Sequence, residues 1–263
     1  MSQPLNVHFL PSLMDASALQ GGTAVIIDVL RASSTITTAL HNGALQVIPC
    51  GTPDAARRIR KELGSDSVLL GGERGGVLIE GFDCGNSPLE YPTGRVAGKT
   101  IAFTTTNGTH AMLQADAANT ILIGAFVNRR AVIERLEADH SPIHLVCAGT
   151  NGAITGEDVL FAGAVVAGLL KNCELQTPNA AQWVLNDCAQ IAHRFWLQSV
   201  GHHSDVSDER HRIVSALLET QGGRNLLGLG YDSDIRLCSM ADSINIVPEL
   251  NRDTNSIVSS ADF

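Results

Sequence analysis

Acidic, basic and hydroxyl side chains follow an apolar segment near the start of the chain, in an order suited to binding a phosphorylated ligand. The run Ala24–Ile27 ends in Asp28, and Arg31, Ser33 and Ser34 follow where a helix is expected to begin. A carboxylate can bind a divalent cation, whereas a guanidinium, hydroxyls and helix N–H groups can bind an anion. The simpler alternative is that Asp28 only caps the helix and pairs with Arg31.

A second apolar segment ends in the same order of an acid followed by an arginine. Glu73 and Arg74 come after the apolar 68–70 and lie between glycines, which let the backbone approach a ligand closely. The irregular stretch that follows adds further polar candidates: Asp83, Asn86 and Ser87. A long irregular segment in a compact domain is usually functional or disordered. The apolar residues within this one favour a function.

Two more strand ends carry polar turns. After 101–103 come side chains and N–H groups that could cradle a phosphate: Thr105, Thr106, Asn107, Gly108 and Thr109. The alternative there is a threonine-rich strand end with an Asn-Gly turn. After 143–147 the chain reaches Glu157 and Asp158, acids that also suit a helix N-terminus without any ligand. As a fourth acid-bearing turn, Asp158 completes a candidate Mg²⁺ site with Asp28, Glu73 and Asp83.

Two other motifs are set aside. Residues 94–100 resemble a phosphate loop, but the glycine spacing is one residue short and the segment precedes a strand instead of a helix. Residues 202–211 hold six potential metal ligands without a recognised metal spacing. Because they fall between two expected helices, we interpret them as a solvated connection.

The four polar turns need a sheet that brings their strands to one edge. Seven short β-branched runs are predicted as strands, at 7–10, 24–29, 46–48, 68–70, 100–103, 120–123 and 143–147. Helical patterns separate most of them, at 33–40, 53–63, 109–115 and 128–138. This alternation predicts an α/β fold with a large, mainly parallel or mixed sheet covered on both faces. Ligands bind at the carboxyl edge of such sheets.

The second half of the chain is predicted to be mostly helical. Expected helices are 155–171, 179–199, 207–221 and 231–241, and the expected closing strand is 244–247. The pair Gly222-Gly223 is interpreted as a helix stop. We expect a single domain over 1–263, with a two-lobed division near residue 150 as the alternative.

Composition and charge limit the kinds of partner and the cellular location that the chain is expected to have. With 263 residues and a formal charge of −9, the chain is not expected to bind nucleic acid, although a bound cation would still allow an anionic substrate. The longest apolar stretch, 160–170, is too short to cross a bilayer. The first residues lack the features of a signal peptide, so a cytoplasmic protein without membrane contact is expected. The six scattered cysteines are expected to be reduced.

Five blocks, taken in order, resemble the 2-phosphosulfolactate phosphatase family: 27–34, 72–76, 81–88, 105–109 and 147–149. Asp234, Cys238, Asp242 and Val247-Pro248 resemble its C-terminal pattern as well, so the likeness covers nearly the whole chain. The resemblance implies a three-layer α/β/α fold. It also implies a Mg²⁺-dependent phosphatase that converts 2-phospho-3-sulfolactate and water to 3-sulfolactate and phosphate, a step that serves coenzyme M synthesis in methanogens.

In this interpretation Asp28, Arg31, Glu73 and Arg74 are catalytic, and the hydroxyl and amide side chains bind the small anionic phosphorylated substrate. Whether Asp28 attacks phosphorus, activates water or only binds metal stays open, because Leu30 stands where aspartyl-phosphate phosphatases carry a second acid. The alternatives are a phosphatase for another small phosphorylated hydroxy acid and a non-catalytic protein that binds a small anion. A homodimer is a further expectation.

Overall fold

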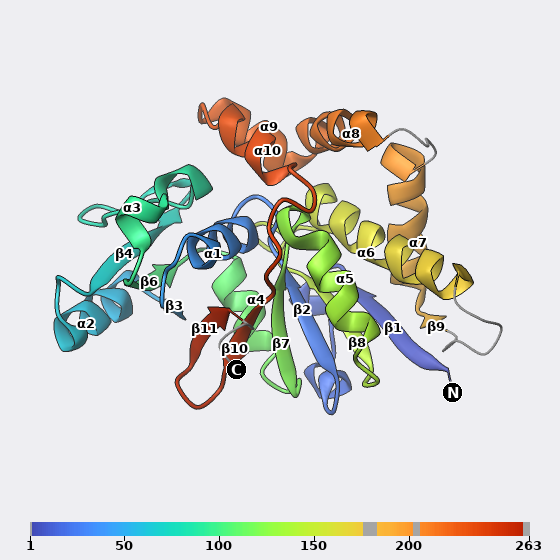
Figure 1. Cartoon of the computed structure of the whole chain (residues 1–263), viewed down its shortest axis with the longest axis horizontal. Helices are drawn as coiled ribbons and strands as arrows, with labels where there is room; N and C mark the ends of the chain where they lie inside the picture. Colours follow the sequence, from blue (N-terminus) through green and yellow to red (C-terminus); the bar gives the residue numbers. More distant parts are fainter. Residues whose placement is uncertain (1, 176–182, 202–205, 260–263) are drawn as a thin grey trace.

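One mixed sheet runs through the computed structural model, which describes residues 2–175, 183–201 and 206–259. Its strands in these ranges are β1 (Gln3–His8), β2 (Thr23–Ile27), β3 (Gln46–Pro49), β4 (Val68–Arg74), β5 (Val77–Leu78), β6 (Thr100–Thr104), β7 (Thr120–Gly124), β8 (Ile143–Cys147), β9 (Trp183–Leu185), β10 (Pro248–Asn251) and β11 (Ser256–Ser259). They lie in the order β5-β4-β6-β3-β11-β10-β7-β2-β8-β1-β9 (Figure 1). The expected large sheet is therefore confirmed.

Two blocks of parallel strands make up most of this sheet. One block contains β7, β2, β8, β1 and β9, and the other contains β4, β6 and β3. The antiparallel hairpin β10–β11 joins the blocks by pairing with β7 and with β3. The carboxyl ends of β2 and β6 nevertheless meet, since a Cβ atom on Gly108 would lie 3.0 Å from Oδ2 of Asp28.

Strand β2 shows why the sequence favours a sheet covered on both faces. All five of its residues are buried. Val25 and Ile27 pack into the core on one face, and Ala24 and Ile26 pack into the core on the other. A continuous apolar run suits a strand in this position. The run ends where Asp28 emerges at the edge of the sheet.

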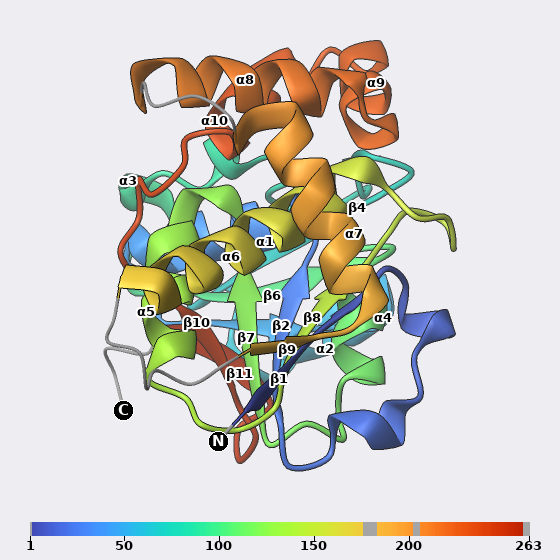
Figure 2. The same cartoon turned by 90° about the vertical axis from the view of Figure 1, so that its right-hand side faces the viewer.

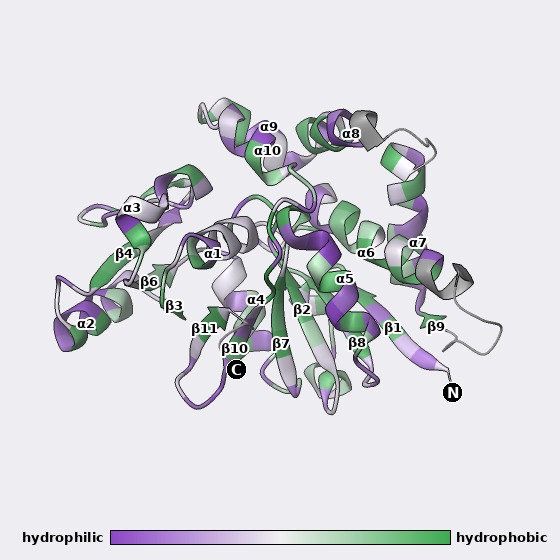
Figure 3. Ribbon diagram, in the orientation of Figure 1, coloured by the Kyte–Doolittle hydropathy of each residue, from purple (hydrophilic) through white to green (hydrophobic). Residues whose placement is uncertain are grey.

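Helices form a layer on each face of the sheet (Figures 1 and 2). α1 (Ala32–His41) and α4 (Gly108–Gln114) contribute to the core on the Ala24 side, whereas α5 (Arg129–Glu137), α6 (Gly156–Leu175) and α7 (Asp187–Trp196) contribute to the core on the Val25 side. α2 (Pro53–Leu63) packs on β4 and β6, and the short α3 (Thr93–Val96) precedes β6. Figure 3 shows the hydrophobic β7 beside α5, which carries hydrophilic residues as well. This is the expected three-layer arrangement.

Three further helices form what we call the cap, at the carboxyl ends of the central strands (Figure 2). They are α8 (Val206–Glu219), α9 (Gln221–Gly228) and α10 (Asp232–Cys238). α9 packs against α6, α8 and α10. The cap therefore faces the edge of the sheet at which the polar turns were expected.

The second half differs from the prediction in several places. The helix expected over 179–199 begins only at Asp187, because 183–185 pairs with β1 as strand β9; residues 179–182 lie outside the described part. Gly222-Gly223 lies inside α9 and does not end the cap helices there. The expected strand 244–247 is wrong as well, since Ile244 packs on Ala125 and Val127 and the closing strands are β10 and β11.

Other expectations concern single features. Residues 202–205, which begin the run of metal-ligand types, lie outside the described part. In that part, the cysteines whose side chains are described are free thiols. None of the described helices is both long and apolar enough to cross a membrane.

Candidate active site

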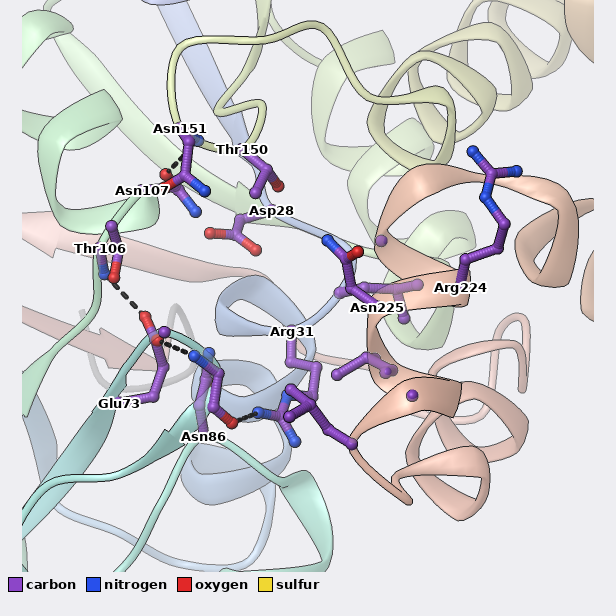
Figure 4. A pocket seen from close by; sticks show the side chains of 17 residues that line it. Asp28, Arg31, Glu73, Asn86, Thr106, Asn107, Thr150, Asn151, Arg224 and Asn225 are labelled. Carbon is purple, nitrogen blue, oxygen red and sulfur yellow. Dashed lines mark hydrogen bonds between the residues drawn. The ribbon is translucent and has the colours of Figure 1, made fainter.

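A pocket of about 480 Å³ lies between the edge of the sheet and the cap. The sheet side supplies residues that follow β2, β4, β6 and β8, and the cap side supplies residues of α9. Figure 4 shows Asp28 near the middle of the labelled side chains, with Arg31 and Glu73 on one side and Thr150 and Asn225 on others. The edge of the sheet thus gathers polar groups from segments far apart in the sequence.

Asp28 is the buried acid of this pocket, with 8% of its surface exposed. Its Oδ1 accepts a hydrogen bond from the N–H of Ala32, at 3.2 Å, and its own N–H donates to Oγ of Ser33. Burial is the main cause that raises the pKa of Asp28 to about 7; the Ala32 N–H opposes it, and nearby Glu73 adds to it. A cation in the pocket would therefore lower the pKa of Asp28, because a cation favours the charged carboxylate.

Arg31 follows Asp28 in the turn after β2 and lines the same pocket, and its guanidinium is held from three sides. Nη1 lies 2.6 Å from Oδ2 of Asp234, Nη2 donates to the carbonyl of Gly76 at 2.9 Å, and the ring of Tyr231 stacks under the group at 4.2 Å. Asp234 also accepts from Oγ of Ser87 at 2.6 Å. The cap helix α10 therefore fixes the direction of Arg31 at the pocket wall.

Glu73 braces two loops of the pocket. Oε2 accepts from the N–H of Gly76 at 2.7 Å, and Oε1 accepts from the N–H of Thr106 at 2.8 Å. The side chain is 6% exposed. Each oxygen keeps a further lone pair, so that Glu73 can still meet a ligand at the pocket surface.

Amide side chains line the rest of the wall. Oδ1 of Asn107 accepts from the N–H of Asn151 at 3.1 Å. Asn86 is 6% exposed, and its buried Oδ1 has no hydrogen-bond partner among the described residues. A buried polar group without a partner is costly. Because this oxygen is an acceptor, a hydrogen-bond donor or a cation would satisfy it, and an anionic oxygen would not.

Several predicted site residues lie outside this lining. Arg74 binds the carbonyl of Glu73 and Oγ1 of Thr104. Asp83 pairs with Arg60 at 2.8 Å, and Asp158 accepts from the N–H groups of Val29 and Gly149. The hydroxyl and glycine positions that do not line the pocket, most of them engaged in local hydrogen bonds, are Ser33, Ser34, Ser87, Thr105, Gly108 and Thr109. Of the expected residues, the lining contains Asp28, Arg31, Glu73, Asn86, Thr106 and Asn107.

The sequence reasoning missed the residues that the cap and the β8 turn contribute. Thr150 and Asn151 come from that turn, and Arg224 and Asn225 come from α9. The signal for α9 was the pair Gly222-Gly223. A Cβ atom on Gly222 would lie 2.1 Å from Oε1 of Glu157, so the glycine marks close packing of α9 rather than a helix stop.

The four proposed metal ligands are not gathered at one point. Among the described residues, no group of three or more His, Cys, Asp or Glu side chains is placed to hold a metal ion. Asp28 and Glu73 do face the same pocket. Mg²⁺ often takes one or two carboxylates and completes its shell with substrate phosphate and water. The pocket fits a Mg²⁺ site of that open kind, in which the substrate is one of the ligands.

Comparisons with known proteins find similarity over nearly the whole chain. Residues 8–253 match a family model described as 2-phosphosulpholactate phosphatase. A protein of Thermotoga petrophila named "Probable 2-phosphosulfolactate phosphatase" is 41% identical over 234 residues, which cover 89% of this chain and 91% of the relative. Proteins of the same name from Clostridium perfringens and Caldanaerobacter subterraneus are 37% and 36% identical, over 93% of this chain and 92% and 93% of the relatives.

Proposed function

The chain belongs to the 2-phosphosulfolactate phosphatase family, and from this premise we propose that it is a phosphoric monoester hydrolase that converts 2-phospho-3-sulfolactate and water to 3-sulfolactate and phosphate. The observation that carries the proposal is the position of Asp28. This buried carboxylate lines the same pocket as Arg31, whose guanidinium is fixed by Asp234. An acid and an oriented cation are among the groups that phosphoryl transfer by positioning and electrostatics uses.

The charge of the pocket supports a role for Mg²⁺ in this reaction. Its lining contains two acids, Asp28 and Glu73, and two arginines, Arg31 and Arg224, and Asp234 neutralises Arg31 from behind. A substrate with phosphate, carboxylate and sulfonate groups would therefore meet no net positive field from the protein alone. Asp28 and Glu73 would hold the ion. Bound Mg²⁺ would withdraw charge from the phosphoryl oxygens and favour attack at phosphorus.

The residues of the chain perform the remaining tasks. Arg31 presents its guanidinium to developing negative charge, and Glu73 keeps the N–H groups of Gly76 and Thr106 in place around the ligand. Asp28 faces the pocket, where its carboxylate can hold the ion, accept a proton from an attacking water or attack phosphorus itself. The cap excludes bulk water from one side of the pocket.

Phosphate release tests the proposal. Purified protein with Mg²⁺ should release phosphate from 2-phospho-3-sulfolactate, EDTA should stop the release, and added Mg²⁺ should restore it. Asp28→Asn should lower kcat by at least about 100-fold, because it removes the charged acid without changing the shape. Binding without release would point to a small-anion-binding protein instead. Equal turnover of 2-phospho acids with and without a sulfonate would point to a broader hydroxy-acid phosphatase.

A phosphoenzyme assay separates the roles of Asp28. Acid-quenched protein that retains labelled phosphate in the wild type, but not in Asp28→Asn, would identify Asp28 as the nucleophile. Undiminished turnover by Asp28→Asn would reject both its catalytic and its metal-binding role. The family resemblance supports a role in coenzyme M synthesis, which the step serves in methanogens. We further propose that the enzyme is cytoplasmic and a homodimer.

A further inference from the structure

Asn225 of α9 is a polar side chain of the pocket that the proposed chemistry does not use. The cap contributes two polar side chains to the described lining, Arg224 and Asn225. The guanidinium of Arg224 donates to the carbonyl of Glu219 in the preceding turn, and Figure 4 shows it directed away from Asp28. Asn225 instead points from α9 toward Asp28 and Thr150 (Figure 4). The amide of Asn225 is therefore the polar group that the cap offers to a ligand.

The packing of α9 fixes the direction of this amide. Gly223 lies so close to the preceding helix that a Cβ atom would stand 1.9 Å from the carbonyl of Leu217. Oγ1 of Thr220 caps the helix by accepting from the N–H of Gly223 at 3.1 Å, and Leu226 is buried in the core beneath it. With Leu226 buried and the helix start anchored, Asn225 is held on a side of α9 that lines the pocket.

Asn107 offers a second amide from the sheet side. Because its Oδ1 accepts from the N–H of Asn151, its NH₂ group is the part left for the pocket. Asn151 belongs to a tight turn closed by two hydrogen bonds between Thr150 and Ala153, and its φ is 52°. This turn holds the acceptor side of Asn107 in place. In Figure 4, Asp28 lies between Asn107 and Asn225, so the two amides are on opposite sides of it and Asn225 is the one on the cap side.

We propose that the amide of Asn225 forms a subsite that binds the sulfonate of the substrate by N–H donation. The proposal rests on the proposed function, which brings the phosphoryl group to Asp28 and Arg31. The sulfonate sits one carbon beyond the phosphorylated carbon and extends from that centre toward a neighbouring wall. Neutral amides suit it, since they donate hydrogen bonds to a permanently charged, weakly basic anion. Asn225 is then a specificity-determining residue supplied by the cap.

A pair of substrates that differ only in the sulfonate tests the subsite. In Asn225→Ala, kcat/KM for 2-phospho-3-sulfolactate should fall roughly 10- to 100-fold, mostly through KM, because one hydrogen bond to a charged group is lost. For 2-phospholactate the fall should stay under about threefold. Equal losses for both substrates would overturn the proposal.

An isosteric variant keeps the test independent of folding. Asn225→Asp keeps the size of the side chain. It replaces a donor by a charged oxygen, so it should lower kcat/KM for the sulfonated substrate more than Asn225→Ala does. Gln221→Ala is the matched control, because it removes an amide from the same helix outside this pocket. Gln221→Ala should leave kcat/KM for both substrates unchanged.

A binding measurement separates this proposal from the proposed function. Calorimetry with 3-sulfolactate and with lactate compares the same two ligands without any turnover. The wild type should prefer 3-sulfolactate, and Asn225→Ala should lose that preference. If the wild type releases no phosphate yet this pattern holds, the proposed function fails and the subsite stands. If Asn225→Ala keeps the preference, the subsite is rejected whatever the turnover.

Discussion

Asp234 and Arg31, which are 203 residues apart in the chain, form an ion pair of 2.6 Å in which both side chains are almost completely buried. The pair joins the cap to the turn after β2. Asp234 also accepts from Ser87, so three segments meet at one carboxylate. Removal of one partner from such a pair leaves the other charged and buried, which costs more than the pair contributes.

Asp234→Ala should therefore lower the free energy of unfolding by about 3–5 kcal/mol, because it leaves the buried Arg31 without its counter-charge. Urea denaturation measures the change. Asp54→Ala is the control, since it breaks an exposed ion pair with Arg57 and should cost less than about 1 kcal/mol. Equal losses of unfolding free energy in the two variants would show that burial does not determine the cost of breaking the Arg31–Asp234 pair.

Glu73→Gln should loosen the loops around the pocket. The carboxylate accepts one N–H from Gly76 and one from Thr106, and the amide of glutamine keeps only one acceptor oxygen. One part-buried N–H then loses its bond to a charged acceptor, at a cost of about 1–3 kcal/mol in the free energy of unfolding. The exposed Glu80 serves as the control, and Glu80→Gln should leave the unfolding curve in place. An unchanged curve for Glu73→Gln would contradict the bracing role.

The first half of the fold could be predicted because its signals are local. The apolar run before Asp28 and the polar residues after it specify a strand, a turn and a helix within a short segment, and the structure has β2 and α1 there. α2 begins and ends at the predicted residues, since Thr52 caps its start and Gly64 follows its end. Ligand binding at the carboxyl edge of the sheet follows from the same pattern.

The position of the cap, and the partner that each acidic side chain binds, could not be predicted in this way. Asp83 and Asp158 stand in polar turns as expected, yet their oxygens are taken by Arg60 and by backbone N–H groups of Leu70, Val29 and Gly149. Sequence spacing does not reveal which partner a carboxylate finds in the folded chain. The helix α9 was missed as a wall of the pocket because only the contact with Glu157 explains Gly222.

Gly222→Ala tests that contact. A Cβ atom at this position would lie 2.1 Å from Oε1 of Glu157, a side chain that is 1% exposed and has little room to move. Overpacking of this kind costs typically about 1–3 kcal/mol, and thermal or urea unfolding measures it. Gly228→Ala is the matched control, because the same helix leaves open space there. In that variant alanine should be neutral or stabilise the helix by up to about 1 kcal/mol.

The His8–His144 pair should make the protein sensitive to acid. Nε2 of His8 lies 3.1 Å from Nδ1 of His144, and the rings stack at 5.4 Å. Burial, followed by the proximity of His144, lowers the pKa of His8 from 6.5 to about 4; burial also lowers the pKa of His144. Between these pH values the unfolded chain binds protons that the folded chain does not. The stability from this pair is therefore complete above pH 6.5 and is lost as the pH falls toward 4.

His8→Gln should flatten this dependence, because glutamine fills a similar space without titrating. Unfolding free energies measured from pH 8 to pH 4 should show a steeper loss for the wild type, by on the order of 2 kcal/mol after allowance for the partial exposure of His8. The buried acids Asp28 and Asp158, whose pKa values are raised, act in the opposite direction, but they are the same in both proteins. The difference between the two curves therefore isolates the histidine pair, and parallel curves would exclude it as the acid-sensitive element.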